Sequence, residues 1–320
     1  PWMYHWMKTR NQKRPLQIPM GMIPDPENES MKRFTLTWGS HRLILGPRTL
    51  VMGVLNITPD SFSDGGRFDT VEKAVTQAGK LVADGADIID IGGESTRPFS
   101  DAVSADEEIR RVVPVIEKIA GRVPVPISID TTKAEVAQQA LNAGACMVND
   151  ISAMRMDSFI GAIAAKAGVP MILMHMQGTP KTMQKTPRYD DLMEEIIGFL
   201  KDAMDRALAA GVTRDRIIID PGIGFGKTYG HNLTLINRLS ALKTLDAPIL
   251  VGPSRKAFIR HTLKKSDQDD LAPSHPDVAI GTQAVVAGAI LNGAHLVRVH
   301  DVAQTQVTAK MIDAIRRETP

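Results

Sequence analysis

The chain has 320 residues, of which 43% are hydrophobic and 23% charged, the composition of an ordinary globular protein. Its 38 basic and 36 acidic side chains nearly cancel, which argues against a nucleic-acid-binding surface, because such surfaces carry a clustered basic excess. A single cysteine excludes an intramolecular disulfide, and no run of about 18 apolar residues is present that could span a membrane.

The first 30 residues are rich in Pro and Met and show neither the two-residue period of a strand nor the 3.6-residue period of a helix. We predict a poorly ordered leader over residues 1–30 and a single domain over residues 31–320. The basic residues of the first ten positions are not followed by an apolar segment, so they do not resemble a secretory signal. With the lone Cys146, this pattern predicts a cytoplasmic protein.

From residue 34, two alternating segments around Gly39-Ser40 predict a β-hairpin. Short apolar segments then alternate with amphipathic stretches of helical length such as 71–82 and 192–210, a pattern typical of a parallel sheet covered by helices. The eight predicted strands are 50–55, 87–91, 126–129, 147–148, 171–174, 217–219, 249–251 and 295–299. Eight such units predict a (β/α)₈ TIM barrel with an N-terminal β-hairpin, a fold that needs roughly 250 residues.

Polar residues follow every one of these strands. They are Asn56, Gly92-Gly93-Glu94, Asp130, Asn149-Asp150, His175, Asp220, Ser254-Arg255-Lys256 and Arg298 with His300-Asp301. In a parallel barrel the carboxyl ends of the strands meet at one rim, where barrel enzymes place their chemistry. Any one of these residues could merely cap the following helix, but eight together predict an active site.

Two loops at this rim are dense in polar residues. Residues 53–66 read Gly-Val-Leu-Asn-Ile-Thr-Pro-Asp-Ser-Phe-Ser-Asp-Gly-Gly, and residues 92–98 read Gly-Gly-Glu-Ser-Thr-Arg-Pro. The first could be an ordinary surface turn, yet Asn56 at its start, where a strand ends, could reach a metal or a phosphate. The hydroxyls and guanidinium of the second suit an anionic group.

These two segments resemble the signature segments of the dihydropteroate synthases, a family of pterin-binding enzymes. The likeness continues through segments 127–133, 148–151, 173–184, 220–228, 252–256 and 298–301, which read ISIDTTK, VNDI, LMHMQGTPKTMQ, DPGIGFGKT, GPSRK and RVHD. It spans about residues 34 to 317 in the family's order. The resemblance implies condensation of 6-hydroxymethyl-7,8-dihydropterin diphosphate with 4-aminobenzoate to give 7,8-dihydropteroate and diphosphate.

The resemblance also implies roles for single residues in binding the pterin. Asp220 would accept the two donors on the pyrimidine edge of the ring, Asn149 would pair with the remaining heteroatoms, and Lys256 would supply a donor. Asp130 would face the ring and favour positive charge at its exocyclic methylene. An alternative for Asp130 is an N-cap of the helix that begins near Lys133.

The same resemblance implies how the diphosphate leaves. Arg97, Arg298 and His300, with Mg²⁺ near Asn56, would compensate its growing charge. Asp60, Thr96 and Arg97 would close over the reacting groups and exclude water. The predicted catalytic residues are Asp130, Asp60, Arg97 and Lys256, and the predicted substrate-binding residues are Thr96, Asp130, Asn149, Asp220, Phe225, Ser254, Lys256, Arg298 and His300.

The 4-aminobenzoate carboxylate would lie near the helix N-terminus after the seventh strand, with Phe225 against one of the rings. Two positions depart from the family pattern. Ala257 stands where the family usually has a serine that binds this carboxylate, and Phe99 stands where it has a glycine. The resemblance further implies a homodimer built on barrel helices.

Two alternatives share the pterin contacts. One is a methyltetrahydrofolate:corrinoid methyltransferase, which needs neither the diphosphate loops nor Ser254-Arg255-Lys256. The other is a non-catalytic pterin-binding protein, which would not need Asn56, Arg97 and a metal.

Overall fold

The structure is a computed structural model, and it describes residues 31–58, 67–95, 102–266 and 271–318. The predicted leader and parts of both polar loops therefore lie outside the described residues.

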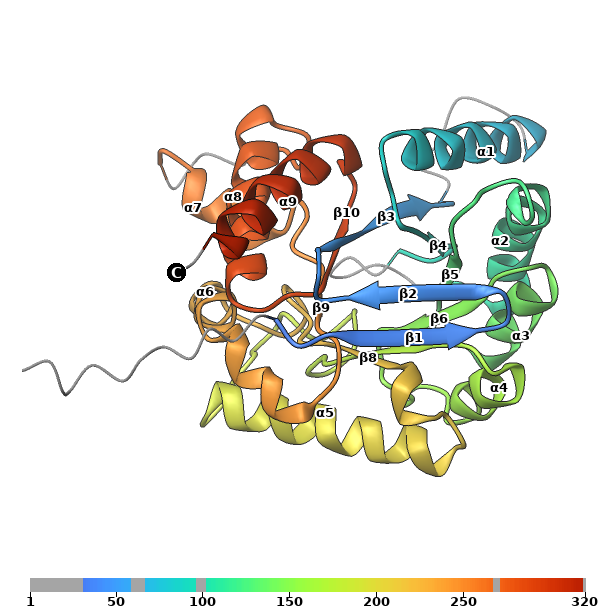
Figure 1. Cartoon of the computed structure of the whole chain (residues 1–320), viewed down its shortest axis with the longest axis horizontal. Coiled ribbons are helices and arrows are strands. Elements are labelled where there is room, and N and C mark those ends of the chain that lie inside the picture. The colour runs from blue at the N-terminus through green and yellow to red at the C-terminus, as the bar shows by residue number, and fades with distance from the viewer. Residues whose placement is uncertain (1–30, 59–66, 96–101, 267–270, 319–320) are drawn as a thin grey trace, which may run out of the picture. The chain divides into compact units, whose positions relative to one another are not determined.

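Eight parallel strands form the centre of the fold (Figure 1). They are β3 (Leu50–Asn56), β4 (Ile88–Gly92), β5 (Ile127–Asp130), β6 (Met147–Asp150), β7 (Met171–Met174), β8 (Ile217–Asp220), β9 (Leu250–Val251) and β10 (Leu296–Val299). Their order is β8-β7-β6-β5-β4-β3-β10-β9, and a parallel bridge between Ile219 and Ile249 joins the two outer strands. The predicted barrel is thus confirmed. Its β8 and β9 sides are joined by this one bridge, whereas the other neighbouring strands pair over two or more residues.

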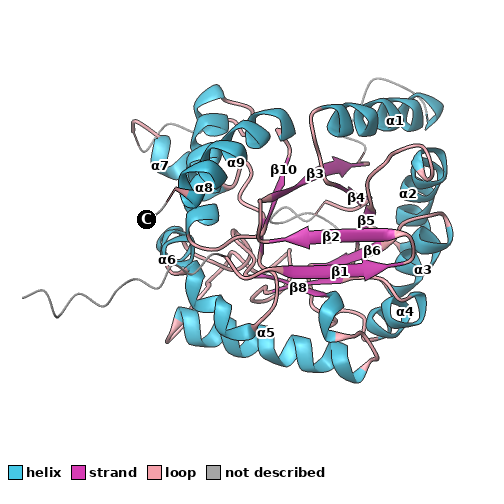
Figure 2. Cartoon of the chain, viewed as in Figure 1, coloured by secondary structure: helices cyan, strands magenta, loops and turns pink. Residues whose placement is uncertain are grey.

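Helices surround this sheet (Figure 2). They are α1 (Arg67–Ala83), α2 (Ala105–Ile119), α3 (Ala134–Asn142), α4 (Phe159–Ala167), α5 (Leu192–Ala209), α6 (Tyr229–Asn237), α7 (Ala257–Leu263), α8 (Pro276–Leu291) and α9 (Val302–Arg317), with the short 3₁₀ helices η2 (Arg214–Arg216) and η3 (Leu239–Leu245). The strands are buried on both faces, which explains why their sequences are almost wholly apolar. Among the helices of the described segments, none has the length and hydropathy needed to cross a membrane.

The predicted hairpin is present as β1 (Phe34–Trp38) and β2 (His41–Leu45), which pair antiparallel. It packs at the amino-terminal end of the strands. The His295 ring, just before β10, bonds to the carbonyl of Lys32 at 3.1 Å and packs edge-on against Phe34. This end of the barrel is therefore covered, and the opposite rim remains for the site.

Strand register aligns the polar residues of that rim. Asn56 pairs with Gly92, Gly92 with Asp130, and Asp130 with Asn149. Farther round the sheet, Met174 pairs with Asp220. Since residues paired in register point to the same face of a sheet, these side chains share one side of the barrel wall.

Candidate active site

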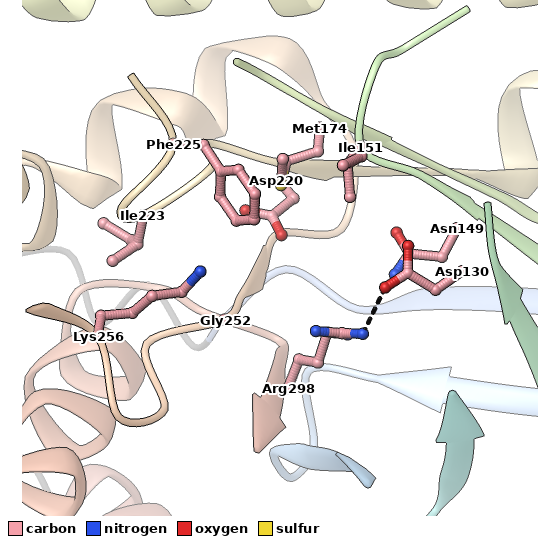
Figure 3. A pocket seen from close by; sticks show the side chains of 10 residues that line it. All are labelled: Asp130, Asn149, Ile151, Met174, Asp220, Ile223, Phe225, Gly252, Lys256 and Arg298. Atoms are coloured by element: carbon pink, nitrogen blue, oxygen red, sulfur yellow. Dashed lines mark hydrogen bonds and ion pairs between the residues drawn. The ribbon is translucent and has the colours of Figure 1, made fainter. Parts of the chain in front are cut away.

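A pocket opens at the carboxyl ends of the strands (Figure 3). It is lined by Asp130, Asn149, Ile151, Met174, Asp220, Ile223, Phe225, Gly252, Lys256 and Arg298. Six of these residues were predicted from the sequence to bind substrate: Asp130, Asn149, Asp220, Phe225, Lys256 and Arg298. The barrel therefore brings together groups that lie up to 168 residues apart in the chain.

Arg298 connects two carboxylates on one side of the pocket. Its Nη2 lies 2.6 Å from Asp130 Oδ2, the bond drawn in Figure 3, and its Nε lies 2.6 Å from Asp90 Oδ2. The Asp90 carboxylate also accepts a bond from Asn149 Nδ2 at 3.0 Å. Asp90 was not predicted, although a carboxylate in the apolar segment Ile88-Ile89-Asp90-Ile91 was a signal in the sequence.

Burial raises the pKa of Asp130 to about 7, because an apolar surrounding disfavours the charged form. Arg298 lowers this pKa, and the carboxylates of Asp90, Glu108 and Asp150 raise it. The N-cap alternative for Asp130 is wrong. Helix α3 has Lys133 as its N-cap residue, and the carboxylate of Asp157 binds the free N–H of Ala134 at 2.8 Å.

Asp220 and Lys256 face each other across the pocket (Figure 3). Asp220 is buried, and its Oδ1 accepts the N–H of Gly222 at 2.7 Å. Burial raises the pKa of Asp220 to about 6 and lowers that of Lys256 to about 8. The Lys256 Nζ lies 3.9 Å from the centroid of the Phe225 ring, a cation–π contact that fixes both side chains.

The turn that carries Phe225 depends on close backbone approach. Gly222 has a φ of +69°, and a Cβ atom there would lie 1.9 Å from the carbonyl oxygen of His175. Behind the turn, the buried Lys227 places its Nζ 2.9 Å from His175 Nδ1 and 3.0 Å from the carbonyl oxygen of Phe225. Burial lowers the pKa of Lys227 to about 7. Sequence reasoning gave Lys227 no role.

Ser254 and His300 lie together beside the pocket without lining it. The Ser254 Oγ and His300 Nδ1 are 2.9 Å apart, and Ser254 Oγ also accepts the His300 N–H at 3.3 Å. Burial, with Arg255 and Arg298 nearby, lowers the pKa of His300 to about 3. The ring is therefore neutral at neutral pH, so any contact with a diphosphate would be a hydrogen bond without charge.

Four residues from the sequence predictions lie outside the described residues: Asp60, Thr96, Arg97 and Phe99. Asn56, the predicted metal ligand, ends β3 beside Gly92. A Cβ atom on Gly92 would lie 3.7 Å from Asn56 Oδ1 and 3.7 Å from Asp130 Oδ2, so the missing side chain leaves space between these oxygens.

The protein atoms near Asn56 can be compared with those that Mg²⁺ binds in proteins. Within the described ranges, no three His, Cys, Asp or Glu side chains gather as a metal site. Mg²⁺ commonly takes only one or two protein oxygens and completes its shell with water and substrate phosphates. The Asn56 amide oxygen, beside a glycine that brings no side chain of its own, fits the role of the one protein ligand in such a partial site.

Comparison with known proteins agrees with this geometry. The family profile described as "Pterin binding enzyme" matches residues 52–300. The dihydropteroate synthase of Synechocystis sp. is 49% identical over 85% of this chain and 92% of its own length. The Xanthomonas albilineans dihydropteroate synthase structure with 4-aminobenzoic acid has a TM-score of 0.81 and 41% identity, covering 90% of this chain and all of its own. Its complex with 7,8-dihydropteroate gives 0.78 and 39%, covering 89% of this chain and 100% of its own.

Proposed function

The chain belongs to the pterin-binding enzyme family, in which it is a dihydropteroate synthase of folate synthesis, and we propose a role in that reaction for each polar group of the pocket. Its relatives carry this activity, and a related structure holds the product 7,8-dihydropteroate. These matches favour the synthase over a corrinoid methyltransferase or a non-catalytic pterin-binding protein.

One observation carries the proposed binding mode: a buried carboxylate, Asp220, faces the same pocket as the amide of Asn149. The pyrimidine edge of a pterin presents an N–H and an amino group side by side, and one carboxylate can accept both. Hydrogen bonds to a charged group contribute about 1.5–3 kcal/mol each. Gly222 already binds Asp220 Oδ1 at 2.7 Å, which fixes the carboxylate before the ring arrives.

The chemical step transfers the pterin methylene from oxygen to nitrogen. The bond between this carbon and the diphosphate oxygen breaks, and its electron pair leaves with diphosphate. The aniline nitrogen then forms the new C–N bond and loses a proton. Asp130 lies at the pocket wall, where its ionised form would stabilise positive charge on the methylene.

Arg298 and His300 would bind the leaving diphosphate, Arg298 through its positive charge and His300 through a neutral N–H. Asn56 would hold Mg²⁺ together with diphosphate oxygens, and the bound ion would supply positive charge that offsets the growing negative charge. We retain the predicted closure by Asp60, Thr96 and Arg97 as part of this proposal.

The second substrate would bind against Phe225 and Lys256, next to the start of α7. Residue 257 is the first of this helix and is exposed. The alanine found there offers no hydroxyl to the 4-aminobenzoate carboxylate, so its binding would depend on the Lys256 charge and on backbone N–H groups.

We further propose a cytoplasmic homodimer. The cytoplasmic location rests on the single free cysteine. The dimer is supported by a stripe on α9 that consists of Val307, Met311 and Ile315, which are 65%, 58% and 55% exposed. Residues four apart share one face of a helix, so the stripe forms a continuous apolar surface that a second copy of the chain would bury.

The test of the binding mode is Asp220→Asn. An asparagine turns one acceptor oxygen into a donor that faces the donors of the ring. We expect the dissociation constant of 6-hydroxymethylpterin, measured by calorimetry, to rise at least about 100-fold, from the loss of two charged hydrogen bonds. Asp202→Asn, an exposed carboxylate on α5, is the matched control and leaves affinity unchanged. Near-normal binding by the Asp220 variant would contradict the proposed mode.

A further inference from the structure

Asp90 lies beneath the pocket wall, in the middle of β4, and its side chain has no exposed surface. It does not line the pocket, yet it touches two residues that do. One oxygen, Oδ2, accepts from Asn149 Nδ2 at 3.0 Å and from Arg298 Nε at 2.6 Å. The other oxygen, Oδ1, is buried and has no hydrogen-bond partner among the described residues.

This contact decides which way the Asn149 amide points. The two ends of an asparagine amide have nearly the same shape, but one donates and the other accepts. An ionised carboxylate only accepts, so the NH₂ end of Asn149 must face Asp90. The carbonyl oxygen and the second N–H are then left for the pocket in a fixed arrangement.

A flip of this amide would exchange the two ends. The carbonyl oxygen of Asn149 would point at Asp90, and the donor would take its place in the pocket. A pterin ring presents donors and acceptors in a fixed order, so the flipped amide would place like groups opposite each other, and at least one buried polar group would lose its partner.

We infer that Asp90 is a positioning residue, which touches no substrate and holds the Asn149 amide in the orientation that matches the pterin ring. The inference rests on the proposed contact between Asn149 and the ring. It adds a residue from β4 to a site whose other predicted parts lie at the strand ends.

A double-mutant cycle tests this route of action, because interaction between two mutations reports whether one residue acts through the other. The probe is 6-hydroxymethylpterin, which lacks the diphosphate, and its dissociation constant is measured by calorimetry for wild type, Asp90→Ala, Asn149→Ala and the double variant. We expect Asp90→Ala to weaken binding about tenfold in the wild type and less than about twofold in the Asn149→Ala background.

Asp90→Asn serves as the conservative variant. Its carbonyl oxygen can take the place of Oδ2 and accept from Asn149 and Arg298, so we expect affinity within about threefold of wild type. A merely structural role, such as balancing the charge of Arg298, predicts the opposite, because asparagine removes that charge. If Asp90→Ala does not fold by circular dichroism, Asp90→Val, of similar size and without an acceptor, replaces it in the cycle.

Three results would overturn the inference: equal weakening by Asp90→Ala in both backgrounds, unchanged affinity of Asp90→Ala, or an Asp90→Asn variant as weak as the alanine one. The Asp220→Asn variant separates this failure from that of the binding mode. If Asp220→Asn no longer binds 6-hydroxymethylpterin and Asp90→Ala weakens binding equally in both backgrounds, the binding mode holds and only the role of Asp90 is wrong. If Asp220→Asn binds 6-hydroxymethylpterin normally, the proposed pterin contacts are wrong, and the role of Asp90 that rests on them is wrong too.

Discussion

At the scale of single residues, Asp130 has a proposed role that requires a negative charge and an environment that disfavours that charge. It must be ionised to stabilise a positive methylene, yet burial raises its pKa to about 7. The groups that set this balance are Arg298, which lowers the pKa, and Asp90, Glu108 and Asp150, which raise it. The upper part of the acid limb of the pH profile should therefore report on this carboxylate, because Asp220, with a pKa of about 6, is protonated only at lower pH.

We predict that kcat/KM for the pterin diphosphate falls as the pH drops through about 7, where Asp130 is protonated, and falls more steeply below about 6, where Asp220 is protonated as well. The sign follows from the raised pKa: protonation of Asp130 removes the negative charge while the protein stays folded. Steady-state rates between pH 5 and 9, at saturating 4-aminobenzoate, check this. In Asp90→Asn, the removal of a neighbouring negative charge should move the acid limb to lower pH. A flat profile down to pH 5 in the wild type would contradict the role of Asp130.

Ala257 gives a second residue-scale prediction. Introducing a hydroxyl by Ala257→Ser adds one hydrogen bond to the 4-aminobenzoate carboxylate, worth about 1 kcal/mol net, so its KM should fall about fivefold with kcat little changed. Ala303→Ser, an exposed alanine near the start of α9, is the control and should leave KM as it is. A KM that does not fall in the Ala257 variant would mean that the carboxylate lies elsewhere.

At the scale of elements, the turn after β8 is the least tolerant piece of backbone at the site. Gly222→Ala places a Cβ atom 1.9 Å from the carbonyl oxygen of His175 and forces alanine into a left-handed φ of +69°. We expect a loss of about 3 kcal/mol or more of stability, seen as a fall in Tm of about 6 °C or more. Gly230→Ala, on α6 with no atom within 4 Å of the added Cβ, should leave Tm unchanged or slightly raised. Equal Tm values for the two variants would show that the turn has other conformations available.

The sequence predicts the elements well because most strands are short apolar segments with a polar residue at their end or just after it. The ends of the strands are predicted less accurately than their presence. Asn149 and Asp150, for example, were predicted to follow the sixth strand but belong to β6. Polar residues at strand ends were recognised as site residues, whereas Asp90 was missed because it lies inside a strand. Lys227 was missed for another reason: its partner His175, 52 residues earlier in the chain, meets it only after β7 and β8 pair.

At the scale of the whole molecule, the barrel separates stability from function. The hairpin closes the amino-terminal end, where Leu36, Trp38 and Leu45 join the main core. The opposite rim carries Asp130, Asp220 and Arg298, charged groups whose burial costs stability unless they are paired. Long-range pairing of this kind cannot be read from a local sequence pattern, because it depends on which strands are neighbours.

The outer surface carries the last prediction, which concerns assembly. The apolar stripe on α9 faces away from the barrel, and a stable dimer of ordinary size would cover about 800 Å² on each copy. Met311 lies at the centre of the stripe, so Met311→Glu would bury an unpaired carboxylate at the interface, and we expect a dimer in the wild type to become a monomer. Light scattering after size-exclusion chromatography measures the mass of the wild type and of Met311→Glu.

Phe159→Glu provides the matched control, because Phe159 is 73% exposed at the start of α4 and a carboxylate there favours the helix. A dimer that survives Met311→Glu, or one that Phe159→Glu disrupts instead, would place the interface on another face of the barrel.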